Sequence, residues 1–128
     1  MESIVIINSN IELIAILQEI FKEENFKVAT YQTKDIKEGR VDIQSILDKH
    51  KPDAILYDIA IPYEENWRLF KTFLNKVIPD DMRLILTTTN KRVLDKMVGP
   101  TPTIEIVGKP FDIDEIIRAA RGKSEATT

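Results

Sequence analysis

The sequence predicts an α/β protein: a doubly wound, five-stranded parallel sheet of (βα)5 type with helices on both faces. Short apolar runs alternate with amphipathic segments along almost the whole chain. The runs are apolar at nearly every position and rich in β-branched residues, which is typical of parallel strands buried on both faces. A chain of 128 residues fits one domain with a full hydrophobic core.

Five runs are predicted as strands, and in chain order they span residues 3–7, 26–31, 54–57, 83–87 and 104–107. The second run is the weakest of the five. Residues 32–40 are polar and include Gly39, so we predict a loop there. Residues 1–122 are expected to form the domain, and the small, polar residues 123–128 a tail or the start of a linker.

Helical periodicity joins these strands. Leu13, Ile16, Leu17 and Ile20 recur at i, i+3, i+4 and i+7, which predicts that they share the inward face of a first helix. The same spacing predicts four further helices, with inward positions 43, 46 and 47; 70, 73, 74 and 77; 94, 97 and 98; and 113, 116, 117 and 120.

The composition excludes several classes of protein. The formal net charge of -3 argues against direct nucleic-acid binding, which depends on clustered Lys and Arg. There is no cysteine, so thiolate chemistry and disulfides are excluded. No secretion signal is recognisable and no apolar run reaches membrane-spanning length. We therefore expect no membrane association and a cytoplasmic location.

Polar residues follow several of the predicted strands. Asp58 ends the third run, Thr87-Thr88 end the fourth, and Lys109 follows the fifth. The carboxyl ends of parallel strands meet at one edge of a sheet, where ligands bind in open α/β folds. The segment after the first run, Asn8-Ser9-Asn10, is polar but uncharged. The pattern predicts a phosphate- or metal-handling site that has lost part of its charge.

Two motifs make this pattern more specific. Residues 57–62 read Tyr-Asp-Ile-Ala-Ile-Pro, and residues 108–111 read Gly-Lys-Pro-Phe. A (βα)5 chain with these motifs at the ends of its third and fifth strands resembles the receiver domain of bacterial response regulators, which has a flavodoxin-like topology. The resemblance covers residues 3 to about 121.

The resemblance implies a role in phosphorelay signalling. Asp58 would be the phosphoacceptor, and Thr88 and Lys109 would contact the phosphoryl group; of the three consecutive threonines 87–89, we select Thr88 by alignment with the family pattern. The donor would be a histidine kinase or a phosphotransfer protein, and an output domain or protein would read the result. The resemblance also implies a cis peptide bond before Pro110. No turnover of a separate substrate is expected, so the chain would not be an enzyme.

The departures from the family concern the metal. Receivers usually hold Mg²⁺ with two acidic residues after the first strand, whereas this chain has Asn8 and Ser9. One unit charge pair at ~4 Å contributes roughly 4 kcal/mol at an effective dielectric constant of about 20. Weak or absent Mg²⁺ binding is expected, with Asp58 and the backbone carbonyl of Ala60 as the main remaining ligands. Asp58 and Lys109 should then form a simple ion pair.

Two further departures concern the switch and the loop after the phosphoacceptor. Ile106 stands where the family usually has a switching aromatic residue, so the usual conformational readout is not expected. Asn66 stands where that loop usually has Gly, and Asn tolerates positive φ.

Three alternatives remain open from the sequence. The chain could be a pseudo-receiver, a phosphorylation-independent interaction or dimerisation module with a structural Asp58–Lys109 pair. The mixed charges on the fourth and fifth predicted helices also allow a homodimer. A mononucleotide-binding protein that uses Ser9 and Asn10 is more remote, because the segment lacks a Gly-rich phosphate loop.

Overall fold

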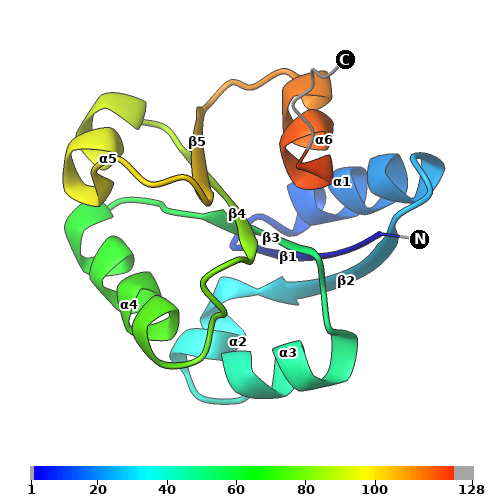
Figure 1. The fold of residues 1–128 in the computed structure, drawn as a ribbon, viewed down its shortest axis with the longest axis horizontal. Helices are drawn as coiled ribbons and strands as arrows, with labels where there is room; N and C mark the ends of the chain where they lie inside the picture. Colours follow the sequence, from blue (N-terminus) through cyan, green and yellow to red (C-terminus); the bar gives the residue numbers. More distant parts are fainter. Residues whose placement is uncertain (1, 123–128) are drawn as a thin grey trace.

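The protein, described here by a computed structural model, contains a single five-stranded parallel sheet in the order β2-β1-β3-β4-β5 (Figure 1). The structure describes residues 2–122, so the predicted tail at 123–128 lies outside the described residues. The strands are β1 Ser3–Asn8, β2 Lys27–Gln32, β3 Ala54–Asp58, β4 Arg83–Thr88 and β5 Ile104–Gly108. The predicted fold class and all five strands are confirmed, with boundaries that move by at most one residue.

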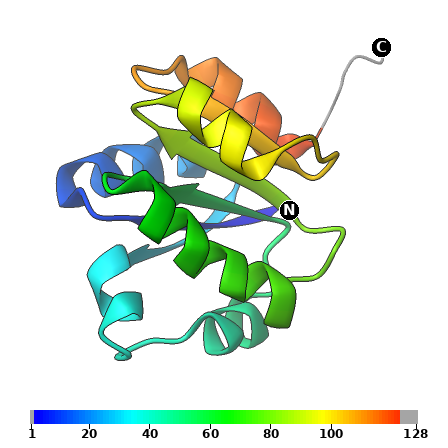
Figure 2. The same cartoon turned by 90° about the vertical axis from the view of Figure 1, so that its left-hand side faces the viewer.

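Six helices in the described part of the chain cover both faces of the sheet (Figures 1 and 2). They are α1 Ile11–Glu23, α2 Thr33–Lys37, α3 Ile43–His50, α4 Tyr63–Lys76, α5 Lys91–Val98 and α6 Ile113–Arg121. Helices α1 and α6 pack on one face, against side chains such as Ile6 and Leu56. Helices α2 to α5 pack on the other face, against their strand neighbours such as Ile7 and Tyr57. The alternation of strand side chains thus divides the core into two layers.

Side-chain caps fix where several helices begin. Asn10 accepts a hydrogen bond from the backbone N–H of Leu13 at the start of α1. Asp112 accepts one from the N–H of Asp114 at the start of α6. Each cap satisfies a backbone donor that the helix itself leaves free.

The predicted loop at residues 32–40 is wrong in its central part, because residues Thr33–Lys37 form α2. This short helix packs only one apolar side chain, Ile36, into the core beside the sheet. A single apolar residue among polar ones produces no helical periodicity, so the sequence pattern could not reveal the helix. Helix α2 follows β2 directly and therefore lies at the carboxyl edge of the sheet.

The inward face of α1 also differs from the prediction. Ile14, Leu17 and Phe21 are its buried residues, and the predicted Leu13 and Ile20 pack partly buried against the same core. Of the predicted residues, Ile16 is the one that is exposed, at 54%. Two apolar stripes overlap on this helix and share Leu17, so periodicity alone could not choose between them. The ring of Phe21 packs at 4.9 Å from that of Phe26, and this contact favours the observed stripe.

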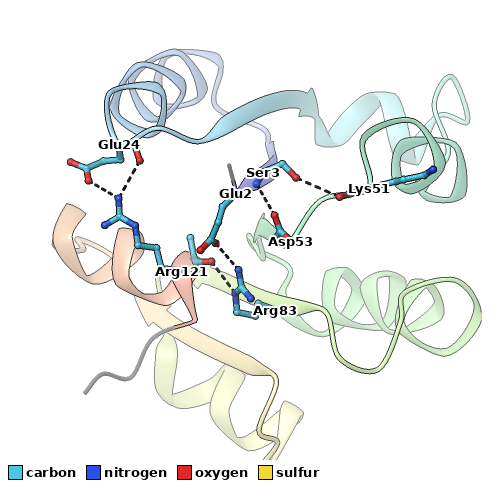
Figure 3. A network of polar contacts seen from close by, with 8 residues as sticks. Glu2, Ser3, Glu24, Lys51, Asp53, Arg83 and Arg121 are labelled. Carbon is cyan, nitrogen blue, oxygen red and sulfur yellow. Dashed lines mark hydrogen bonds and ion pairs between the residues drawn. The ribbon is translucent and has the colours of Figure 1, made fainter. Parts of the chain in front are cut away.

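At the opposite edge of the sheet, where the strands begin, polar contacts hold neighbouring elements together (Figure 3). Arg83 donates to the carbonyl of Ala120 and pairs with Glu2 at 2.8 Å. Arg121 binds both the backbone and the side chain of Glu24. These contacts join α6 to β4 and α1 at the end of the fold that is remote from the predicted site.

Candidate phosphoryl-transfer site

Asp58 is the last residue of β3, and it is buried at the carboxyl edge of the sheet. Its side chain is only 4% exposed, while the side chain of Lys109, which follows β5, is 25% exposed. The predicted meeting of these two charges is confirmed: Lys109 Nζ lies 2.6 Å from Asp58 Oδ1. An ion pair at this distance and burial is held in a fixed geometry, unlike a surface pair.

The same carboxylate oxygen accepts a second hydrogen bond. The hydroxyl of Thr87 donates to Asp58 Oδ1 at 2.7 Å. Asp58 Oδ2, in contrast, accepts no hydrogen bond from the residues that the structure describes. The two oxygens are therefore inequivalent: one is bound by a cation and a hydroxyl, and the other is free to react.

The structure places Thr87, and not the selected Thr88, at the carboxylate. Thr87 is the register partner of Asp58 across β3 and β4. Thr88 is fully buried, and its hydroxyl oxygen accepts from the N–H of Asn90 at 3.2 Å. Successive side chains of a strand point to opposite faces, so the register admits only one of two neighbouring threonines.

Backbone hydrogen bonds hold the site's strand ends together. The N–H of Ile59 donates to the carbonyl of Thr87, and that of Lys109 donates to the carbonyl of Thr88, both at 2.8 Å. The peptide bond between Lys109 and Pro110 is cis, as the resemblance implied. The segments that carry the carboxylate and the ammonium group are thus both anchored to β4.

Asn8 and Ser9, which stand in place of the acidic pair, lie in different environments. Asn8 is buried, and its side-chain oxygen already accepts a hydrogen bond from the N–H of Asn10 at 2.9 Å. Ser9 is exposed and lines a small cavity of about 180 Å³ together with Asp58 and Ala60. Only Ser9 of this pair therefore borders the space next to the carboxylate.

Asn66 has a role that the sequence did not indicate. It lies in α4 with no positive φ, so the expectation of a loop position with positive φ is wrong. Its buried side-chain amide donates to the carbonyl of Ala60 at 2.8 Å. Because Ala60 was the expected backbone ligand of Mg²⁺, this hydrogen bond occupies part of the predicted metal site.

A Mg²⁺ ion does not fit the residues of this site. No group of three or more acidic or histidine side chains able to hold a metal occurs within residues 2–122. Asp58 Oδ1 already faces the ammonium group of Lys109, and the Asn8 and Ala60 oxygens already accept hydrogen bonds. Mg²⁺ prefers carboxylate oxygens in octahedral geometry, and this pocket provides one carboxylate.

Ile106 and Tyr57 are two further side chains near the site. Ile106 is 9% exposed and packs in the same core layer as Tyr57. Burial and the negative charge of Asp58 raise the pKa of Tyr57 to about 12. Tyr57 therefore stays protonated at neutral pH and adds no charge to the site.

Solved structures with the same fold are receiver domains. The Francisella response regulator 1452 receiver domain superposes with a TM-score of 0.66 at 20% identity, covering 96% of this chain and 100% of the other. A structure described as a transiently phosphorylated "switch" in bacterial signal transduction gives a TM-score of 0.70 at 17% identity, covering 94% and 92%. The BeF3-activated N-terminal receiver domain of Klebsiella pneumoniae RstA gives 0.63 at 16% identity, covering 91% and 94%.

The chain therefore has the fold of response-regulator receiver domains over most of its length. No model of a protein family matches the sequence, and no curated protein matches it. Among the described helices, none is both long and apolar enough to cross a membrane.

Proposed function

We propose that this chain is a phosphorelay receiver that accepts a phosphoryl group on Asp58. The observation that carries the proposal is the asymmetry of the carboxylate: Lys109 and Thr87 hold Oδ1, while Oδ2 accepts no hydrogen bond from the described chain. Asp58 also lines a cavity at the edge of the sheet. A buried carboxylate whose orientation is fixed and whose second oxygen is free is suited to nucleophilic attack.

The chemistry requires alignment more than acid–base assistance. Asp58 Oδ2 attacks the phosphorus of a phosphohistidine, an O–P bond forms, and the N–P bond breaks. The electron pair of that bond stays on the departing imidazole, which takes up a proton. The product is an acyl phosphate, whose oxygens gain contacts with the ammonium group of Lys109 and the hydroxyl of Thr87. The proposal keeps Lys109 in the role predicted from the sequence and gives the hydroxyl role to Thr87 in place of Thr88.

Protein partners follow from this chemistry. The donor is a histidine kinase or a phosphotransfer protein in the cytoplasm, and the readout is made by an output domain or protein. Ile61, beside the site, is 73% exposed and supplies an apolar contact point for the donor. We propose that the chain assists its own phosphorylation and does not turn over a separate substrate.

Labelling with a small phosphoryl donor tests the proposal. The chain is incubated with acetyl phosphate or phosphoramidate, and the intact mass is followed with and without hydroxylamine, which cleaves acyl phosphates. We expect one added phosphoryl group that hydroxylamine removes and that Asp58→Asn abolishes. Absence of labelling under all conditions, or equal labelling of Asp58→Asn, would refute the proposal.

A pseudo-receiver is the second candidate, and Asn8 and Ser9 in place of the acidic pair favour it. In that case the Asp58–Lys109 pair would only stabilise the edge of the sheet, and the surface formed by α5 and α6 could support a homodimer. Its signature would be self-association, measured by analytical ultracentrifugation, that is the same in wild type and Asp58→Asn, without labelling by any donor.

A further inference from the structure

The cavity beside Asp58 has a wall that the sequence analysis did not anticipate. Besides Ser9 and Asp58, it is lined by Thr33 and Lys37 of α2. These two residues are four positions apart, so both side chains lie along the same edge of the helix. The buried Ile36 fixes the helix against the core and thereby fixes the position of that edge.

Lys37 is available for a ligand. It forms no ion pair or hydrogen bond with the part of the chain that the structure describes, unlike Arg40 on the same segment, which pairs with Asp35. Asp58 lines the same cavity, its side chain is 4% exposed, and its Oδ2 accepts no hydrogen bond from the described residues. A cation and a buried aspartate with one unpartnered carboxylate oxygen thus line the same small space.

From this arrangement we infer that Lys37 takes the place of the divalent cation, so that the site holds a phosphoryl group on Asp58 without Mg²⁺. The inference rests on the proposed function and adds that this function does not require a metal. Thr33 and Ser9 supply hydroxyl donors at the same cavity, and the Asn66–Ala60 hydrogen bond takes up one of the two lone pairs of the backbone oxygen that a metal would need.

The charges of the site support this role. Before phosphorylation the site contains one carboxylate, Asp58, and two ammonium groups, Lys109 and Lys37. The bound phosphoryl group carries about two negative charges at neutral pH, and formation of the acyl phosphate removes the carboxylate charge. The two lysines then balance the acyl phosphate without any metal. An additional Mg²⁺ would be repelled by Lys37.

Beryllofluoride binding tests the inference, because this phosphoryl analogue binds the carboxylate without any transfer reaction. The full chain is titrated with beryllium fluoride in magnesium-free buffer and again with millimolar Mg²⁺, while the backbone amide signals of Ser9 and Ala60 are followed by NMR. We expect saturable binding without magnesium and less than a roughly twofold gain when it is added. Lys37→Gln should weaken binding about three- to tenfold, a modest factor because an exposed charge is screened by solvent.

Two variants serve as controls. Lys37→Arg keeps the charge and should keep binding, and Lys34→Gln removes an exposed lysine of α2 that does not line the cavity. Binding that requires Mg²⁺, or binding that Lys37→Gln leaves unchanged, would overturn the inference while the proposed phosphorylation of Asp58 stands. Absence of binding under both conditions would overturn both. Lys37-dependent binding combined with failure of every phosphoryl donor would support the inference and refute only the proposed function.

Discussion

Removal of Lys109 should destabilise the fold more than removal of its partner. In Lys109→Met the carboxylate of Asp58, with a side chain only 4% exposed, is left buried without a counter-charge. Breaking a fully buried ion pair costs about 3–5 kcal/mol. Because the Lys109 side chain is 25% exposed and the Thr87 hydrogen bond persists, we expect a loss of about 2–3 kcal/mol in the free energy of unfolding.

The reverse change should cost less. Asp58→Asn removes the buried charge and leaves an ammonium group that can turn toward water, so we expect a change of at most about 1 kcal/mol. In the double variant the buried charge and its partner are both gone. A double-mutant cycle should therefore give a coupling energy of about 1–2 kcal/mol.

Urea unfolding followed by the fluorescence of Trp67, which is 7% exposed in the folded chain, measures these differences. The matched control is Lys91→Met, which breaks an exposed pair of similar length: Lys91 lies 2.9 Å from Asp95, with side chains 51% and 47% exposed. That control should lose at most about 0.5 kcal/mol. If Lys109→Met were as stable as the wild type, or no less stable than the control, the buried-pair reasoning would be refuted.

Three further outcomes are expected. Thr87→Val should lower the free energy of unfolding by about 1–2 kcal/mol in the same urea assay, because it removes a hydroxyl donor from the buried carboxylate. Stability should fall as the pH drops below 6.5, because burial and nearby lysines lower the pKa of His50 in the folded chain, where His50 Nε2 lies 2.6 Å from the Tyr31 hydroxyl. The unfolded chain therefore binds the proton at a higher pH than the folded chain does. His50→Gln should flatten this fall of stability with pH in thermal melts. Ile61→Asp should slow phosphoryl transfer from a histidine kinase severalfold.

Each of these has a result that contradicts it. A Thr87→Val variant as stable as the wild type would show that the hydroxyl at the carboxylate contributes nothing to the free energy of unfolding. Identical slopes of stability against pH for wild type and His50→Gln would remove the histidine from the explanation; above pH 6.5 it contributes no slope, because it is neutral in both states. Slower labelling of Ile61→Asp by acetyl phosphate would mean damage to the site itself and not to partner docking.

The sequence predicted the parts of the fold that depend on local patterns. Apolar runs such as Ile4-Val5-Ile6-Ile7 are visible without any tertiary information, and all five proved to be strands. Caps such as Asn10 and Asp112 are local in the same sense, because each contacts a backbone N–H only two or three residues further along the chain. The buried face of α1 is not, since its two apolar stripes have the same period and only packing against Phe26 distinguishes them.

For the site, the sequence by itself determined which chemical groups end the strands: the carboxylate of Asp58, the lysine before Pro110, and the uncharged Asn8 and Ser9. Only the tertiary structure decided that Thr87 faces the carboxylate, because three consecutive threonines are identical until strand register orients them. It also placed Lys37 at the cavity, through a helix anchored by a single apolar side chain. Register and long-range packing are properties of paired segments, so no pattern within one segment can contain them.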